Sequence, residues 1–259
     1  MTRVAVIGAA GRMGRELCRA ALETAGIELA GGTAESGAPE LGSDLGDLCG
    51  FGKAGVTAAE DPPDSAEVLI EFTTPEATVE HLSYGKPHVI GTTGFLEDQL
   101  HKVEEAARNV PIVLAPNTSV GVNLLQGIVR ELSAKLGEAY DIEVVEAHHR
   151  NKKDAPSGTA LFLARAAADG REKDLEEVAV YGREGFSPRQ EGEIGIHAVR
   201  GGAVVGEHRL VFYSGGEEVE VTHRALSRRT FADGALRAAR FVADAQPGLY
   251  SMADVLEAG

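Results

Sequence analysis

Along the first part of the chain, short apolar runs typical of buried strands alternate with segments whose apolar residues recur at helical spacing. Residues 4–7 form a β-branched apolar run ending at a glycine, which predicts a buried parallel strand. Residues 13–25 repeat apolar side chains at helical spacing, and residues 27–30 begin a second strand. The same alternation predicts strands at 68–72, 88–90 and 112–115, with helices at 75–84 and 97–108. Alternating strands and helices favour a doubly wound parallel sheet of the Rossmann type.

One long segment interrupts this alternation. Residues 36–64 are rich in Gly, Ser, Asp and Pro and lack either hydrophobic period. We expect an extended connection with little regular structure there.

The pattern changes near Ser119. A longer helix is expected at 121–136, a strand at 142–147 and a helix at 158–168. Strand-like stretches follow at 193–200, 203–213 and 217–223, and the glycine pairs at 201–202 and 215–216 predict hairpins between them. We therefore expect a second, α+β domain with a mixed or antiparallel sheet over 120–228. The first domain spans 1–119 and is completed by 229–259, where a helix at 230–243 returns to it.

Composition and charge narrow the classes of partner. The chain is 43% hydrophobic and 25% charged, as in ordinary globular proteins, and its net charge is −15. A surface this acidic repels phosphate backbones, which argues against nucleic acid as the main partner. Cys18 and Cys49 are too few for a disulfide framework, and no apolar run approaches a membrane span. Without a secretory pattern at the start of the chain, we expect a cytoplasmic protein without a membrane anchor.

A glycine motif follows the first predicted strand and opens the first predicted helix. Residues 8–14 fit G-x-x-G-x-x-G, in which glycines allow the backbone to approach a pyrophosphate. The helix N-terminus supplies N–H donors and the positive end of its dipole. The motif predicts a dinucleotide site. Glu35, 21 residues after Gly14, is a candidate for the ribose hydroxyls, although a solvated loop carboxylate fits the sequence equally well.

Small polar residues also follow the later strands of this domain. The carboxyl ends of strands in an open α/β sheet are where ligands bind. Candidate cofactor contacts at these junctions are Phe72, Thr73, Gly91, Thr92, Thr93, Ala115, Pro116, Asn117 and Thr118.

A basic segment stands out in this acidic chain. Two histidines, one arginine and two lysines lie within residues 148–153, and Ser157 occupies a natural N-cap position. A helix N-terminus facing Lys and His suits a carboxylate or phosphate ligand. A solvated basic loop is the alternative. We expect no metal site, because adjacent histidines on a strand point to opposite faces and no spaced Cys or carboxylate completes a ligand set.

These motifs together resemble one enzyme family, the 4-hydroxy-tetrahydrodipicolinate reductases (dihydrodipicolinate reductases). The resemblance runs nearly from end to end and is carried by GAAGRMGR, EFTTPE, VIGTTGF, APNTSVGVN and EAHHRNKKDAPSGTA. It implies reduction of a cyclic dicarboxylate with NADH or NADPH, in diaminopimelate and lysine biosynthesis, by a homotetramer assembled through the second domain.

The resemblance also implies roles for individual residues. His148 corresponds to the catalytic acid/base and Lys152 to the proton donor, although the sequence leaves open which of them delivers the proton. Substrate contacts correspond to His149, Lys152, Ser157, Gly158, Thr159 and Arg228. Cofactor contacts correspond to Gly8, Ala9, Ala10, Gly11, Arg12 and Met13, together with 91–93 and 115–118.

Cofactor choice and function each have an alternative. Residues 27–37 contain two glutamates and no Lys or Arg, which favours NADH over NADPH. Arg12 and Lys53 are the cations that could reverse this preference from other loops. Another two-domain nicotinamide oxidoreductase acting on an amino or imino acid shares the glycine loop without needing the basic segment. A non-catalytic dinucleotide-sensing protein predicts nucleotide binding without turnover.

Overall fold

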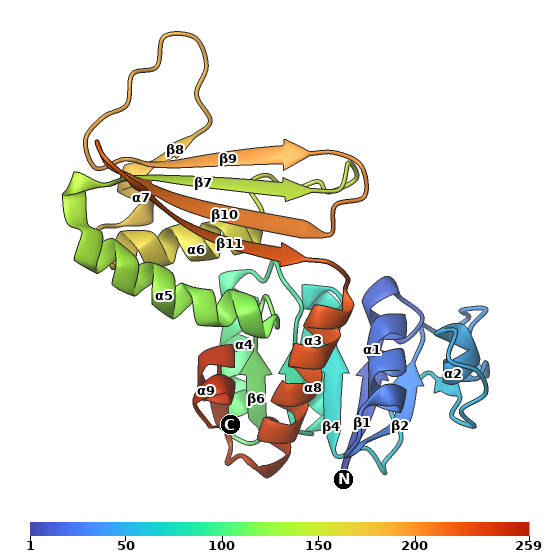
Figure 1. Cartoon of the computed structure of the whole chain (residues 1–259). Helices are drawn as coiled ribbons and strands as arrows, with labels where there is room; N and C mark the ends of the chain where they lie inside the picture. The colour runs from blue at the N-terminus through green and yellow to red at the C-terminus, as the bar shows by residue number, and fades with distance from the viewer. Residues whose placement is uncertain (259) are drawn as a thin grey trace. The chain divides into compact units, whose positions relative to one another are not determined.

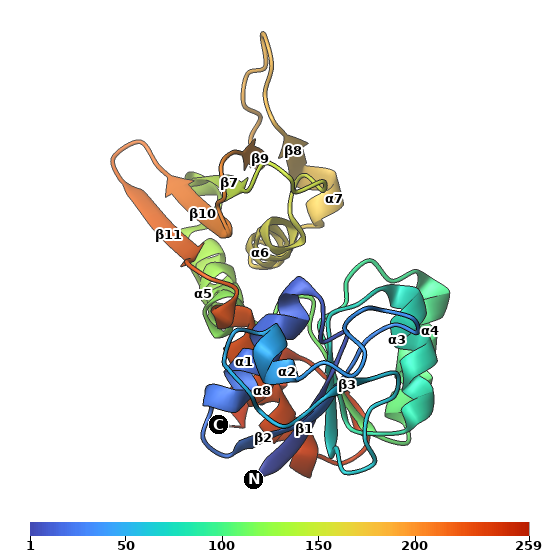
Figure 2. The same ribbon diagram turned by 90° about the vertical axis from the view of Figure 1, so that its right-hand side faces the viewer.

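A computed structural model describes residues 1–258 (Figures 1 and 2). The chain divides into two compact units, one formed by Met1–Val120 with Arg228–Gly259 and the other by Gly121–Ser227. Over the described residues, no helix combines the length and apolar character needed to cross a membrane.

The first unit contains a seven-stranded sheet in which every strand pair is parallel. Its spatial order is β12-β6-β5-β4-β1-β2-β3. The strands are β1 (Thr2–Ile7), β2 (Ile27–Thr33), β3 (Ala58–Ala59), β4 (Val68–Glu71), β5 (His88–Ile90), β6 (Pro111–Leu114) and β12 (Gly248–Tyr250). The chain runs outward from β1 in both directions, so the strand order reverses between β1 and β4. This is where a doubly wound sheet binds its ligand.

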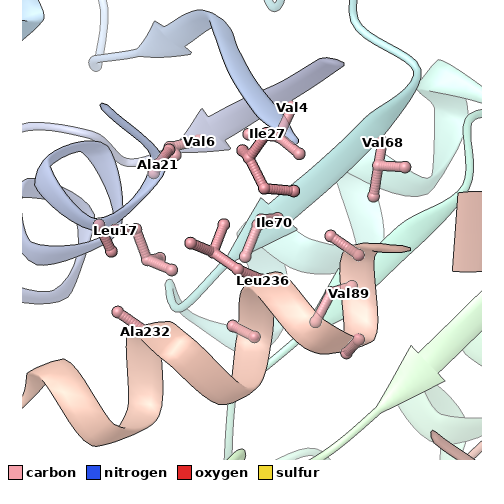
Figure 3. Packing of buried hydrophobic residues seen from close by; sticks show 14 of the residues in the cluster. Val4, Val6, Leu17, Ala21, Ile27, Val68, Ile70, Val89, Ala232 and Leu236 are labelled. Carbon is pink, nitrogen blue, oxygen red and sulfur yellow. The ribbon is translucent and has the colours of Figure 1, made fainter. Parts of the chain in front are cut away.

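Helices cover both faces of this sheet. They are α1 (Arg12–Glu23), α2 (Leu45–Leu48), α3 (Pro75–His81), η1 (Leu82–Tyr84), α4 (Glu97–Ala107), α8 (Arg229–Asp244) and α9 (Met252–Glu257). On one face, Val4 and Val6 pack against Leu17 of α1 and Leu236 of α8 (Figure 3). On the other face, Ile90 of β5 packs against Val103 of α4. Burial on both faces explains why these strands read as continuous apolar runs.

The second unit contains a mixed five-stranded sheet in the order β11-β10-β7-β9-β8. Its strands are β7 (Asp141–His148), β8 (Ala179–Tyr181), β9 (Ile194–Arg200), β10 (Gly206–Tyr213) and β11 (Glu218–Ala225). β10 is antiparallel to β7 and β11, whereas β9 is parallel to β7 and β8. The helical segments are α5 (Val120–Leu136), η2 (Gly137–Ala139), α6 (Gly158–Asp169) and α7 (Leu175–Val178). Val129 of α5 and Leu163 of α6 bury one face of the sheet against Ile142 and Phe212.

The fold class predicted from the sequence is confirmed, with corrections in local structure. The hairpin expected at Gly201–Gly202 is wrong, because β7 lies between β9 and β10. The hairpin at Gly215–Gly216 does join the antiparallel pair β10 and β11. The expected loop at 36–64 contains α2 and β3, and α2 begins where Asp44 caps the amides of Gly46 and Asp47.

Candidate functional site

The glycine loop of the first unit has the local geometry of a close-packed strand-to-helix turn. Gly8 has φ +70°, a left-handed conformation that favours glycine. A Cβ at Gly14 would lie 2.1 Å from the carbonyl oxygen of Gly8, so only glycine allows α1 to begin this close to β1. Gly11 is the N-cap residue, and its helix receives no side-chain cap. The first-turn N–H groups of α1 therefore have no acceptor within the helix, which leaves them for an anion.

The end of β2 is fastened to this loop. The amide of Gly8 donates to Thr33 Oγ1 at 3.1 Å, and the amide of Ala9 donates to the Thr33 carbonyl at 2.8 Å. Glu35 follows two residues later and is exposed. Arg12 and Lys53 are also exposed. The carboxylate of Glu35 thus lies in a segment attached directly to the glycine loop.

Two further predicted segments meet at the carboxyl ends of β4 and β5. The Thr73 amide donates to Thr92 Oγ1 at 3.1 Å. A Cβ at Gly91 would lie 2.2 Å from the ring of Phe72, so only glycine at this position leaves room for the ring. A Cβ at Gly8 would lie 3.1 Å from Thr73 Cγ2, so the glycine loop lies at the same edge of the sheet as the ends of β4 and β5. Thr93 is exposed there, whereas Thr92 is buried with its hydroxyl inside the threonine network.

In the segment after β6, Pro116 is exposed, whereas Thr118 is buried and holds the segment to α8. The Ala115 amide donates to the Ile90 carbonyl at 2.9 Å, next to Gly91, and Pro116 is exposed. Asn117 Oδ1 accepts from the amide of Ser119. Thr118 is fully buried, and its hydroxyl donates to the Phe231 carbonyl of α8 at 2.7 Å. Thr118 therefore fastens the segment to α8.

In the second unit, the basic segment begins at the end of β7. His148 is the last residue of the strand, and its side chain is 10% exposed. Its Nδ1 lies 2.6 Å from Glu146 Oε2. Lys152 lies in the following loop, where Nζ is 2.9 Å from Asp154 Oδ2, and His149 is half-buried.

The loop leads into the N-terminus of α6. Ser157 is the N-cap, and its Oγ accepts from the Ala160 amide at 3.2 Å, as the sequence predicts. The same Oγ lies 3.0 Å from Nε2 of His208 on β10. Gly158 is exposed and Thr159 half-buried in the first turn. The N-terminus of α6 therefore follows the loop that carries Lys152 and lies beside His208, and a helix N-terminus in such surroundings suits a carboxylate.

Burial changes the acidity of the two histidines. Burial lowers the pKa of His208 to about 3, with His148 and His223 adding to the effect. Burial also lowers the pKa of His148, against the opposing influence of Glu146. Both imidazoles are therefore mainly neutral at neutral pH before any anion binds.

Several residues of the two candidate sites were given no role in the sequence analysis, although Glu71 and Glu146 lie within the motifs EFTTPE and EAHHRNKKDAPSGTA. Glu71, the last residue of β4, and Glu146, two residues before the end of β7, are completely buried carboxylates. Arg200 of β9 pairs with Glu146, and His88 of β5 with Glu71. The available signal was an acidic residue inside an apolar strand, because a buried charge needs a partner. Arg228 was predicted as a substrate contact and lies at the N-cap of α8, half-buried, in the first unit.

Within residues 1–258 there is no cluster of three or more His, Cys, Asp or Glu side chains arranged to hold a metal ion.

Comparison with known proteins gives two matching family models. The model described as dihydrodipicolinate reductase, N-terminus, matches residues 2–118. The model described as dihydrodipicolinate reductase, C-terminus, matches residues 121–256. Together they span nearly all of the chain.

Curated relatives match over the same length. The 4-hydroxy-tetrahydrodipicolinate reductase of Rubrobacter xylanophilus is 75% identical over 256 residues, covering 99% of this chain and 98% of the relative. The enzyme of the same name from Hahella chejuensis is 47% identical over 264 residues, covering 99% of each.

Solved structures agree in fold. A dipicolinate-bound dihydrodipicolinate reductase from Paenisporosarcina sp. has a TM-score of 0.73 at 26% identity, with 97% of each chain covered. A myo-inositol dehydrogenase from Corynebacterium glutamicum has a TM-score of 0.60 at 14% identity, covering 95% of this chain and 90% of the other. The second likeness concerns the fold alone.

Proposed function

The chain belongs to the dihydrodipicolinate reductase family, and on this premise we propose that it reduces 4-hydroxy-tetrahydrodipicolinate to tetrahydrodipicolinate with NAD(P)H. The step belongs to diaminopimelate and lysine biosynthesis. Overall, the substrate loses water and gains one hydride and one proton, and NAD(P)H becomes NAD(P)⁺. The observation that carries the proposal is one chain holding both a glycine loop at an uncapped helix end and the His148–Glu146 pair at the start of a basic loop.

The first unit fits a dinucleotide. The close approach of Gly14 to Gly8 and the uncapped first turn of α1 suit the pyrophosphate. Thr93, which is exposed at the neighbouring strand end, offers its hydroxyl and backbone groups to the nicotinamide ribose or carboxamide, and Thr73 lies at the same edge, held there by Glu71 and Thr92. Bound there, the cofactor supplies hydride from its nicotinamide ring.

The second unit fits the dicarboxylate. Lys152 and the first turn of α6, at Gly158 and Thr159, would hold one carboxylate, with Ser157 shaping that turn. His149 and Arg228 are further cationic or donor groups for the ring and the second carboxylate. Cations near the reacting carbon also stabilise negative charge as it develops.

His148 is proposed as the catalytic acid/base and Lys152 as a proton donor. His148 is mainly neutral before substrate binds, because burial lowers its pKa. Two substrate carboxylates nearby would raise that pKa, because an opposite charge favours the protonated imidazole. Proton uptake would then accompany substrate binding, and the proton would be available where hydride transfer requires it.

NADH is the proposed preferred cofactor. Glu35 follows the end of β2 and is exposed, so its carboxylate can accept hydrogen bonds from the ribose hydroxyls of NADH. The same charge repels the 2′-phosphate of NADPH.

A homotetramer built through the second unit is proposed for the assembly. Helices α5 and α6 cover one face of the five-stranded sheet (Figure 1). On the opposite face Val199 is 51% exposed and Tyr213 37% exposed, and Phe186 in the loop before β9 is 98% exposed. Apolar side chains this exposed favour burial against other copies of the chain.

The cytoplasm is the proposed location. Cys18 and Cys49 are both free thiols, and burial raises the pKa of Cys18 to about 12, which makes it inert. Free thiols fit a reducing compartment.

A spectrophotometric assay tests the reaction. Loss of NADH or NADPH absorbance is followed while the unstable precursor is generated in situ. We expect oxidation that depends on the precursor. Absence of precursor-dependent oxidation with both cofactors would refute the proposed activity.

A further inference from the structure

Glu146 is a buried carboxylate whose two oxygens are both fully used. Oε2 accepts from Arg200 Nη1 at 2.7 Å and lies 2.6 Å from His148 Nδ1. Oε1 accepts from Arg200 Nη2 at 2.7 Å and from the Ser157 amide at 2.9 Å. The side chain is 0% exposed. Four donors around one carboxylate match its capacity as an ionised group.

The charge state of Glu146 decides the tautomer of His148. Burial would raise the pKa of Glu146, but hydrogen bonds from Arg200, His148 and the Ser157 amide outweigh it and lower that pKa. An ionised carboxylate only accepts hydrogen bonds, so Nδ1 of His148 must carry a hydrogen. The neutral imidazole therefore has its free electron pair on Nε2.

Glycine at position 206 leaves room for that second nitrogen. A Cβ at Gly206 would lie 3.1 Å from His148 Nε2 and 3.5 Å from Cδ2. Gly206 is buried, and its φ lies outside the left-handed region, so alanine is compatible with its backbone. An added methyl group would therefore act mainly by crowding the Nε2 side of the imidazole.

Arg200 joins Glu146 to the rest of the basic segment. Besides its two bonds to Glu146, its Nη2 donates to the Asp154 carbonyl at 2.5 Å. One carboxylate–guanidinium pair thus fastens the end of β7, the loop carrying Lys152 and the N-cap of α6. The guanidinium also balances a negative charge that would otherwise repel a dicarboxylate close by.

We propose that Glu146 is a positioning residue for the reaction, which fixes the Nδ1–H tautomer of His148 and directs proton exchange to Nε2, with Arg200 keeping Glu146 ionised and in place. This inference rests on the proposed function for its kinetic consequence. Its tautomeric consequence concerns the free protein and is independent of turnover.

The direct test is an NMR titration of the full-length protein with ¹³C,¹⁵N-labelled histidine, with the His148 signals assigned by their loss in His148→Gln. We expect neutral His148 to carry its hydrogen on Nδ1. Charged and titratable groups face this ring from β7 (Glu146), β9 (Arg200), β10 (His208) and the loop (Lys152). Glu146→Gln removes the only anion among them, so the titration midpoint of His148 should fall by about one pH unit.

A matched control lies on the other face of the same strand. Glu143 pairs its Oε2 with His197 Nε2 at 2.7 Å and also forms ion pairs with Arg183 and Arg189. Glu143→Gln therefore removes the same kind of carboxylate from β7 without touching His148. The His148 midpoint should stay unchanged in this control and return toward the wild-type value in Glu146→Asp, which restores the charge.

Kinetics provide the second readout. Glu146→Gln should lower kcat by about 10- to 100-fold, the range found when a metal-bound histidine loses the group that orients it. If protonated His148 is the acid, the decline of kcat/KM at high pH should move to lower pH, following the NMR midpoint. Gly206→Ala should lower kcat while leaving the Nδ1–H tautomer intact, and it keeps the test available if Glu146→Gln does not fold.

The outcomes distinguish the positioning role of Glu146 from the proposed reductase reaction. An unchanged His148 midpoint in Glu146→Gln, or a neutral wild-type His148 protonated on Nε2, would overturn the positioning role whatever the kinetics show. Full activity in Gly206→Ala would overturn Nε2 as the exchanging nitrogen. A wild-type protein with the expected titration and no turnover would instead refute the proposed reaction.

Discussion

The hydroxyl of Thr73 donates a hydrogen bond of 2.8 Å to the carboxylate of Glu71, which is completely buried. The same carboxylate lies 2.9 Å from His81 Nδ1 and 3.1 Å from His88 Nε2. Thr73 in turn connects through its amide to Thr92 on the next strand end. A buried charge therefore supports the edge of the sheet where we propose that the nicotinamide binds.

Glu71→Gln should destabilise the first unit in a pH-dependent way. Burial would raise the pKa of Glu71, but hydrogen bonds from His81, His88 and Thr73 bring it down from 4.5 to about 2. The ionised form thus stabilises the folded state fully above pH 4.5, and this is lost as pH falls toward 2. Such a shift corresponds to about 3 kcal/mol of unfolding free energy at pH 7.

Urea unfolding at pH 7 and pH 3.5 measures this effect. The gap between wild type and Glu71→Gln should narrow at the lower pH. Glu76→Gln, an exposed change on α3, is the control and should cost less than about 0.5 kcal/mol. A gap that is independent of pH would mean that the variant acts through packing instead of charge.

Gly14→Ala should both destabilise the protein and weaken cofactor binding. The new methyl carbon would meet the Gly8 carbonyl oxygen at 2.1 Å, which forces α1 away from β1. Overpacking of this kind costs about 1–3 kcal/mol, and the displaced first turn should raise the KM for NADH. Gly127→Ala on α5 is the matched control, since no atom lies within 4 Å of its added Cβ. It should stabilise by about 0.5–1 kcal/mol.

Local periodicity predicted the elements of this fold better than their pairing. The apolar run of β1 and the helical spacing of α1 are properties of neighbouring residues, so they can be read from the sequence. Gly201–Gly202 is a true turn signal, yet the strand that pairs with β9 and β10 comes from residues 141–148, far away in the chain. Sequence spacing around the turn contains no information about that insertion.

The sequence predicted those site residues that lie close together in one motif. His148, Lys152 and Ser157 stand within ten residues, and the N-cap bond of Ser157 is as expected. Glu146 and Arg200 were given no role because their pairing exists only after β7 and β9 align, and because β7 also contains Asp141 and Glu143, so nothing local distinguishes Glu146. The edge strand β12 was missed because Gly248–Tyr250 contains no buried apolar run, whereas β5, which is equally short, is buried throughout.

Removing the two proposed proton carriers should affect kinetics differently. His148→Ala should lower kcat by about 10²- to 10⁴-fold, the usual loss for a general acid. Lys152→Ala should lower kcat and raise KM, because the ammonium is proposed to bind a carboxylate as well as donate. Lys153→Ala, an exposed neighbour, should keep both constants near wild type. Near-normal kinetics in both His148→Ala and Lys152→Ala would mean that the segment is a solvated loop.

The proposed tetramer predicts a solution mass of four chains at micromolar concentration, measured by light scattering. Phe186→Asp should shift the mass toward smaller species, because its side chain is 98% exposed in the single chain and is expected to be buried by a partner. Phe51→Asp is a control in the first unit, where an aromatic ring 47% exposed should leave the mass unchanged. A wild-type mass of one chain would rule out the assembly.

Cofactor preference should depend on the charge at the end of β2. Glu35 follows Thr33, whose hydroxyl and carbonyl hold the glycine loop, so position 35 can reach the adenosine ribose of a dinucleotide bound there. Glu35→Arg replaces a carboxylate that repels the 2′-phosphate with a guanidinium that can pair with it, and kcat/KM should move toward NADPH. Glu28→Arg makes the same charge change near the start of β2.

Glu28 lies five residues before Thr33, which is about 16 Å away at the usual rise of a strand. Glu28→Arg should therefore leave the ratio of the two kcat/KM values close to that of wild type. If both arginine variants shift the ratio equally, the cause is overall charge, and Glu35 does not contact the ribose. If wild type already favours NADPH by about tenfold, roughly 1.4 kcal/mol, a cation from another loop, such as Arg12 or Lys53, must outweigh Glu35.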